Sequence, residues 1–103
     1  MTISEISALI VGDTDIFVTI TDFNNMKKYI KTFYPNKSFA EITDFDELYA
    51  WRTEEPNFEE KTGCFLNRSY KRLYLRTNYD EANLKIVGLQ IIDDSLDVIV
   101  ELI

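Results

Sequence analysis

Histidine is absent from this sequence, cysteine occurs once, and Asp and Glu together occur 18 times, so carboxylates dominate the side chains that could perform chemistry. The absence of histidine excludes the usual zinc ligand sets and every histidine-based catalytic arrangement. Cys64 has no histidine to ionise it and lies in a β-favouring run, so we interpret it as a small packing residue and not as a nucleophile. A single cysteine also excludes an internal disulfide.

The carboxylates do not by themselves indicate an enzyme. Two carboxylates at a suitable separation can perform acid–base chemistry, but among 18 acids some pair will meet that condition in any fold. A domain of 103 residues also leaves little volume for a catalytic pocket once its core is built. We therefore expect no enzymatic activity.

Motifs for metals and cofactors are incomplete. Asp13-Thr14-Asp15 has the opening spacing of a calcium loop, but the glycine and the glutamate that such a loop needs further on are missing. We interpret these residues as a turn before a strand. The three glycines are isolated from one another, which excludes the glycine-rich loops that cradle phosphates. We expect no metal and no cofactor.

The strongest functional signal is the position of the acids. Residues 41–60, which we call the acidic segment, contain eight acids and one base, so this segment alone carries a net charge of -7, equal to that of the whole chain. One interpretation is a solvated helix face with Phe45, Leu48 and Trp51 turned into the core. The alternative is a surface that binds a cationic partner, with aromatic anchors for contact and acids for steering. The concentration of the whole imbalance in one segment favours the second interpretation.

A basic protein is the expected partner, because nucleases carry positive clefts for phosphate and an acidic protein can occupy such a cleft. The predicted partner-binding residues are Asp44, Asp46, Glu47, Tyr49, Trp51, Glu54, Glu55, Phe58, Glu59 and Glu60. The basic groups elsewhere lack the density of a nucleic-acid tail, so we expect no direct contact with nucleic acid. They are Lys27, Lys28, Lys31 and Lys37 in one stretch, and Arg68, Lys71, Arg72 and Arg76 in another.

Small, acidic, histidine-free and without a catalytic constellation, the chain resembles in kind the immunity proteins that bacteria make against their own or their neighbours' toxins, including those of contact-dependent inhibition. The resemblance implies a non-enzymatic inhibitor that blocks a toxin nuclease. One alternative is a phage or plasmid protein that mimics nucleic acid to block a defence nuclease. Another is a small dimeric regulatory or ligand-binding module whose strand at 96–102 is an exposed edge.

The length and composition predict one domain over residues 1–103. No apolar run is long enough for a membrane span, and the N-terminal residues lack the pattern of a signal peptide. We therefore expect a cytoplasmic protein that is a monomer or a weak homodimer.

The first half of the chain predicts helices around one strand. Helical spacing of apolar residues predicts a helix to about Ile10, capped by Thr2 or Ser4, and a second helix that starts after Asp22 and stops before Pro35. A β-rich run predicts a strand over residues 15–21. Residues 38–43 suggest a further short strand. A capping-box pattern at Asp44 predicts a helix to about Thr53, although residues 48–53 also alternate like a strand.

The second half of the chain predicts a β-meander. Residues 54–62 contain a proline and four acids and are interpreted as an exposed loop. Four β-favouring runs at 63–67, 72–78, 84–92 and 96–102 follow, separated by polar turns that imply antiparallel neighbours. The third run is apolar on both faces, which places it near the centre of the sheet. The pattern predicts an α+β fold with N-terminal helices on one face of a mainly antiparallel sheet of about four to six strands.

Overall fold

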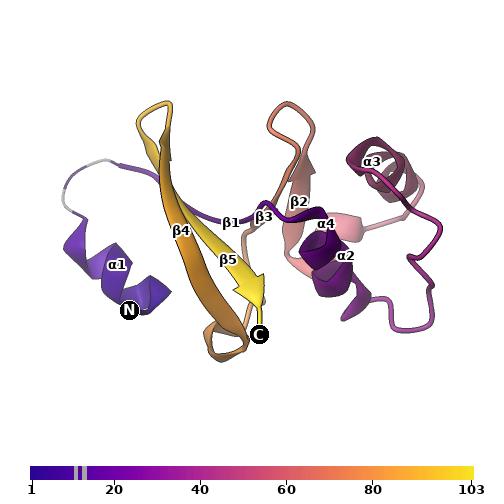
Figure 1. Cartoon of the computed structure of the whole chain (residues 1–103), viewed down its shortest axis with the longest axis horizontal. Helices are drawn as coiled ribbons and strands as arrows, with labels where there is room; N and C mark the ends of the chain where they lie inside the picture. The colour runs from indigo at the N-terminus through magenta and orange to yellow at the C-terminus, as the bar shows by residue number, and fades with distance from the viewer. Residues whose placement is uncertain (11, 13) are drawn as a thin grey trace.

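The chain forms an α+β fold in which helices pack against a five-stranded, mainly antiparallel sheet (Figure 1). The structure is a computed structural model that describes residues 1–10, 12 and 14–103, so the calcium-like Asp13 lies outside the described residues. The fold class expected from the sequence is confirmed. The elements are α1 (Ile3–Leu9), β1 (Ile16–Ile20), α2 (Phe23–Lys31), α3 (Phe45–Thr53), α4 (Phe58–Thr62), β2 (Cys64–Asn67), β3 (Arg72–Leu75), η1 (Glu81–Asn83), β4 (Leu84–Ile92) and β5 (Ser95–Leu102).

The first two helices begin where the sequence predicted. Thr2 caps α1 through a capping box: its hydroxyl accepts a hydrogen bond from the Glu5 backbone amide, and the Glu5 carboxylate accepts one from the Thr2 amide. Asp22 caps α2 by accepting from the amide of Asn25. Helix α2 ends at Lys31, before Pro35, as the restriction on residues that precede proline requires.

The segment between α2 and α3 is not a strand, contrary to the expectation for residues 38–43. Phe39 and Ile42 are both buried, and the amide of Ile42 donates to the carbonyl of Phe39 at 3.1 Å. This spacing of three residues belongs to a turn, whereas a strand would bury every second residue. Residues 48–53 belong to α3, so the helical interpretation of that stretch is the correct one.

Residues 54–62 were expected to be an exposed loop, and this expectation is wrong for its second half, which forms α4. Phe58 and Thr62 lie one helical turn apart and are both buried. Asn57 and Gly63 adopt left-handed conformations at the two ends of this short helix, with φ of 60° and 67°. A side chain at Gly63 would collide with the backbone oxygen of Thr77, so glycine is required there.

The strand order is β2-β3-β1-β5-β4, which differs from a continuous meander. The last four strands form two hairpins, β2–β3 and β4–β5, and β1 lies between them. β1 is antiparallel to β3 and parallel to β5, with Val18 opposite both Leu75 and Val98. The sequence pattern indicated each of these five strands, besides the wrongly predicted one at residues 38–43, but could not show that a distant strand separates the two hairpins.

β4 is an edge strand, so the prediction that it lies near the sheet centre is wrong. Its second half exposes Leu89 at 56% and Ile91 at 70% of their surface. A β-bulge at Val87 and Gly88 places both residues opposite Ile99 and shifts the register of the strand. The apolar run was interpreted as covered on both faces, but the part of the strand near the hairpin turn is mostly exposed. β5, which was expected to be the exposed edge in the dimeric alternative, is an interior strand.

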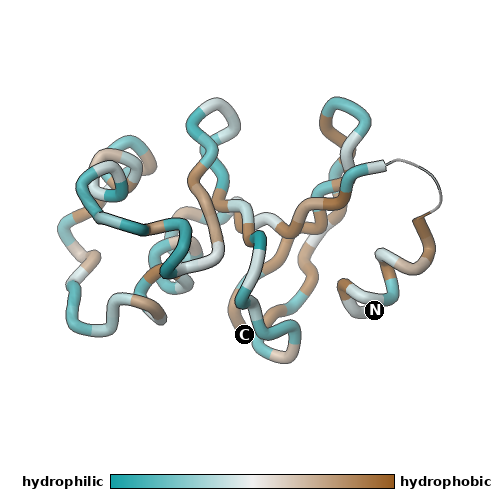
Figure 2. Tube along the Cα trace, turned by 180° about the vertical axis from the view of Figure 1, so that it is seen from behind, coloured by the Kyte–Doolittle hydropathy of each residue, from teal (hydrophilic) through white to brown (hydrophobic). Residues whose placement is uncertain are grey.

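One face of the sheet carries the core. Buried residues that pair across the strands, such as Ile20, Leu73 and Val100, point to the helices and meet Ile30 of α2 and Leu48 of α3. Figure 2 shows hydrophobic stretches along the strands in the middle of the molecule and hydrophilic turns around them. α1 lies beside β4 at one end of the molecule and the other helices lie at the opposite end (Figure 1).

On the other face, the two hairpins come together. Both hairpin turns project to the same side of the sheet, at the top of Figure 1. The Tyr70 hydroxyl in one turn donates to the carboxylate of Asp93 in the other at 2.6 Å. Below the turns, Arg72 forms an ion pair of 2.9 Å with Asp97, whose side chain is only 2% exposed. Side chains from both hairpins therefore cover part of this face without a helix.

Candidate functional site

The acidic segment occupies α3, the turn after it and α4. Three predicted acids lie at the start of α3, where Asp44 caps the helix and Asp46 and Glu47 lie in its first turn. The helix dipole favours negative charge at this position. The other four lie beyond the end of α3 or on α4. They are Glu54, Glu55, Glu59 and Glu60. All of the seven predicted acids are exposed except Glu55, which is half-buried.

Most carboxylates of the acidic segment have no bond within the molecule. Asp44 accepts from the amide of Glu47, and Glu47 accepts from the hydroxyl of Thr43. The structure shows no hydrogen bond or ion pair for the carboxylates of the other five predicted acids within the part of the chain that it describes. These carboxylates are available to a partner at no cost in internal contacts.

Acids outside the segment are used differently. Six of them stabilise the fold: two cap helices or turns through backbone amides, one completes the capping box of α1, and three bind side chains of other elements. These acids are Asp22 and Asp80, then Glu5, then Glu81, Asp93 and Asp97. The Thr2 hydrogen bonds lower the pKa of Glu5, and those from Ser4 lower the pKa of Glu81.

A hollow of about 260 Å³ lies where α3 ends and α4 begins. Glu55, Glu59 and Glu60 line it, so three of the unbonded carboxylates surround one depression. Arg52 also lines the hollow, with its guanidinium 4.5 Å from the ring centre of Tyr49. Carboxylates grouped in this way form strong, charge-assisted hydrogen bonds with a lysine or arginine side chain.

The predicted aromatic anchors are mostly internal. Phe58 is 3% exposed and belongs to the core, so its ring is not accessible to a partner. Trp51 is half-buried and makes edge-to-face contacts with Tyr34, Phe39 and Phe58, at centroid distances of 5.2, 5.0 and 5.9 Å. These contacts hold α3, α4 and the turn after α2 together.

Tyr49 is the remaining aromatic residue of the predicted set. It is half-buried, and the guanidinium groups of Arg52 and Arg68 lie 4.5 and 5.8 Å from its ring centre. Both arginines therefore cover part of the ring. Arg52 is a site residue that the sequence reasoning missed, because it was counted only as the single base among eight acids. Its signal was its position one helical turn after Leu48, on the side of α3 that turns toward the core.

Cys64 and the residue types that can ligate metals were compared with what a nucleophile or a metal site requires. Cys64 is fully buried, and burial raises the pKa of its thiol to about 12, which keeps it protonated. Among residues 1–10, 12 and 14–103, no group of three or more Cys, Asp or Glu side chains is placed to hold a metal ion. In the same described part of the chain, no helix is long and apolar enough to cross a membrane.

A scan against protein-family models, a search of curated proteins and a search of solved structures each found no match for this chain. The site is therefore interpreted from its own geometry and charge.

Proposed function

We propose that this chain is a non-enzymatic inhibitor of the immunity-protein kind, which binds the cationic active-site cleft of a protein toxin, a nuclease, through the acidic segment. The observation that carries the proposal is the contrast between acids. Five of the seven predicted carboxylates in the segment make no internal bond in the described part of the chain, whereas six acids elsewhere stabilise the fold. Selection for stability alone does not account for this division.

The geometry suggests how the segment would bind. The exposed carboxylates at both ends of α3 attract a basic surface over distances of about 10 Å at ordinary salt, which speeds encounter. The hollow lined by Glu55, Glu59 and Glu60 then accepts a lysine or arginine of the partner. The aromatic contribution is smaller than the sequence suggested, because Phe58 is buried and Trp51 is packed against three other rings.

In this proposal the chain acts in the cytoplasm, as a monomer or weak homodimer, and makes no direct contact with nucleic acid or membrane. A nucleic-acid mimic is less well supported, because most of the described acids without an internal side-chain bond gather in one segment. In addition, Arg72 and Arg76 lie on the opposite side of the sheet from the helical core. The dimeric alternative finds one specific support in β4, an edge strand with exposed Leu89 and Ile91.

The test begins with affinity capture of the partner from the native organism, including the product of the adjacent gene. Binding kinetics of the captured protein are then measured at two salt concentrations with Glu59→Lys/Glu60→Lys. The matched control is Asp15→Lys/Glu101→Lys, which makes the same change in net charge outside the segment. We expect the association rate to fall by about tenfold or more at low salt in the first variant and much less in the control. We also expect the captured protein to be a nuclease that the wild-type chain inhibits.

Equal effects of the two double variants would show that only net charge matters and would refute the role of the segment. A captured partner with an acidic or neutral surface would refute the proposal itself. Sedimentation of the chain alone at several concentrations distinguishes the dimeric alternative from the proposed inhibitor. A module that pairs through β4 sediments as a dimer without any partner.

A further inference from the structure

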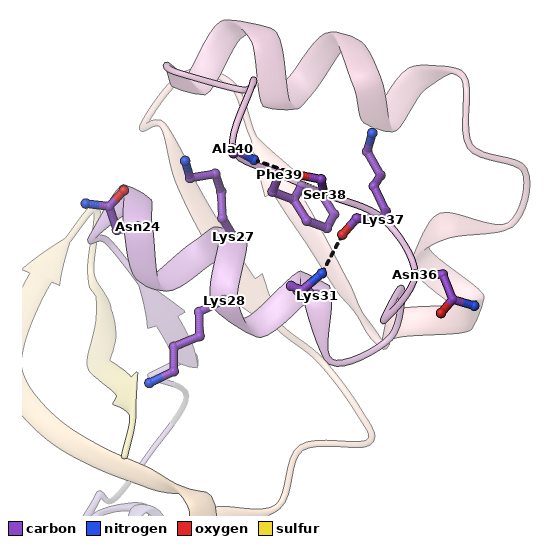
Figure 3. A pocket seen from close by; sticks show the side chains of 9 residues that line it. All are labelled: Asn24, Lys27, Lys28, Lys31, Asn36, Lys37, Ser38, Phe39 and Ala40. Carbon is purple, nitrogen blue, oxygen red and sulfur yellow. Dashed lines mark hydrogen bonds between the residues drawn. The ribbon is translucent and has the colours of Figure 1, made fainter.

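A depression with a volume of about 550 Å³, largely open to solvent, lies beside α2 (Figure 3). We call it the lysine pocket. All its lining residues come from one continuous stretch of the chain, formed by α2 and the turn that follows it. They are Asn24, Lys27, Lys28, Lys31, Asn36, Lys37, Ser38, Phe39 and Ala40.

The charge of this stretch is opposite to that of the chain as a whole. Residues 23–40 contain four lysines and no acid, in a protein with a net charge of -7. None of these lysines forms an ion pair in the described part of the molecule, where the structure shows one between Arg72 and Asp97. Four lysines therefore line this depression, and none of them is paired with a carboxylate among the described residues.

Two of the ammonium groups are held in place by backbone carbonyls. Lys27 donates to the carbonyl of Ile42 at 2.9 Å, and Lys31 donates to the carbonyls of Lys37 at 2.6 Å and Pro35 at 3.3 Å. An ammonium group has three donors, so each of these lysines keeps at least one for a ligand. Cations fixed before binding lose less conformational entropy when an anion arrives than lysines that extend freely into water.

The two remaining lysines, Lys28 and Lys37, differ in how they are placed. Lys37 lies with its ammonium 5.5 Å from the ring centre of Phe39 and 5.4 Å from that of Trp51, which restricts its position. In Figure 3, Lys27 and Lys37 flank the chain at Ser38 from two sides, whereas Lys28 points away from the other three. Asn24, Asn36 and Ser38 add neutral hydrogen-bonding groups at the edges.

We propose that the lysine pocket binds a small multivalent anion of the oligophosphate or phosphate-ester class. Several ammonium groups around one cavity match an anion that carries charge on several oxygens. A long polyanion fits less well, because a nucleic-acid strand leaving the pocket would meet the carboxylates of α3, which lies directly above it in Figure 3. None of the residues that line the lysine pocket is among the predicted partner-binding residues, so this inference does not rest on the proposed function.

In the experiment the whole chain is titrated with inorganic triphosphate, and binding is measured by calorimetry and by amide NMR. We expect shift changes confined to residues 24–42. Lys27→Gln/Lys31→Gln should weaken binding by about tenfold or more, because it removes two fixed charges from the site. The matched control is Lys71→Gln/Lys85→Gln, which removes two exposed lysines elsewhere and should leave the affinity within about twofold of wild type.

A second measurement needs no substitution, since Lys31 also holds the turn at residues 35–37 and its loss could perturb the fold. Triphosphate should protect Lys27 and Lys31 of the wild-type chain from amine acylation more strongly than Lys71 and Lys85. Absence of binding, equal loss of affinity in both double variants, or uniform protection of all lysines would each overturn the proposal. Tighter binding of a single-stranded oligonucleotide than of triphosphate, with shift changes outside residues 24–42, would replace it with a nucleic-acid site.

Discussion

The acidic segment and the lysine pocket lie next to each other on the helical part of the molecule and differ in how their charges are held. Lys27 and Lys31 of the pocket are anchored to three backbone carbonyls. The carboxylates of Glu54, Glu59 and Glu60 in the segment form no hydrogen bond or ion pair with other described residues. Neither set of side chains forms an ion pair among the described residues, yet the two lysines are fixed by hydrogen bonds and the three carboxylates are not.

This difference indicates two kinds of recognition. Fixed cations around a cavity favour a small ligand of one geometry, because little entropy is lost on binding. Free carboxylates on long side chains can adapt to a large partner and contribute mainly to the rate of encounter. Clusters of equal charge in a sequence can therefore have different roles, and the internal hydrogen bonds distinguish them.

The largest effect is expected at a carboxylate that the fold uses. Asp97→Asn removes the charge that faces Arg72 across the sheet, where the carboxylate is 2% exposed. Breaking a buried pair leaves the other charge without compensation and costs about 3 to 5 kcal/mol. The free energy of unfolding is measured by chemical denaturation. The control is Asp46→Asn, a free carboxylate of the acidic segment, which should change stability by less than about 0.5 kcal/mol.

Similar losses in the free energy of unfolding for Asp97→Asn and Asp46→Asn would contradict the distinction between acids that are bonded within the fold and acids that are not. The double variant Arg72→Met/Asp97→Leu should be more stable than Asp97→Asn. An apolar pair leaves no buried charge unpaired, whereas the single variant leaves Arg72 without its partner.

The next largest effect is expected at Trp51, whose ring the two regions share. Trp51 packs on Phe39 beside the lysine pocket and on Phe58 of the acidic segment. We expect Trp51→Ala to lower the free energy of unfolding by about 3 kcal/mol, with Trp51→Phe losing much less. Unfolding is followed by circular dichroism, since the variant removes the only tryptophan. A variant that keeps its stability and loses partner binding would show that Trp51 is a binding anchor after all.

A smaller effect is expected at the tethered lysine. Lys31→Met keeps most of the aliphatic stem but removes the hydrogen bonds to Pro35 and Lys37, which should cost about 1 kcal/mol. Lys28→Met is the control, because the ammonium group of Lys28 forms no hydrogen bond with the described residues and its side chain is exposed. Thermal denaturation of both variants provides the measurement. Equal melting temperatures would mean that the tethers contribute nothing and that the pocket lysines are as free as the carboxylates.

The smallest effect is expected when the free acids are neutralised together. The fourfold variant carries Gln in place of Glu54, Glu55, Glu59 and Glu60. Its free energy of unfolding should differ from that of the wild type by less than about 1 kcal/mol. At low salt we expect a slight gain, because the like charges no longer repel each other. Denaturation at two salt concentrations measures both the size and the sign. A loss of several kcal/mol would reveal internal bonds to these carboxylates and would remove the main support for the proposed function.

Local signals in the sequence predicted much of the fold. Capping residues Thr2, Asp22 and Asp44 marked three helix starts, because caps depend on side chains within three residues of each other. The α4 helix was missed, since Pro56 and the neighbouring acids are typical of loops and the burial of Phe58 and Thr62 depends on distant elements. The order of the strands was missed for the same reason. A hairpin is indicated by the turn residues between its two strands, whereas no local signal indicates which strands pair with β1.

The site was predicted only in part. The exposure of the acids followed from their charge, as water solvates a carboxylate far better than a protein interior. The burial of Phe58 could not be inferred, because an aromatic ring is equally compatible with a core and with an interface. The hydrogen bonds from Lys27 and Lys31 to backbone carbonyls could not be predicted from the sequence either. They depend on where the carbonyls of residues 35–42 lie after folding.

The position of β1 between the two hairpins has a consequence for the order of assembly during synthesis. β1 pairs with β3 and β5, which are made more than 50 residues later, whereas each hairpin joins strands that are close in sequence. Contacts between distant residues form slowly because a long loop must close first. Val18 and Ile20 therefore stay without strand partners on the ribosome until the second half of the chain has emerged, and the sheet closes last around the strand that was made first.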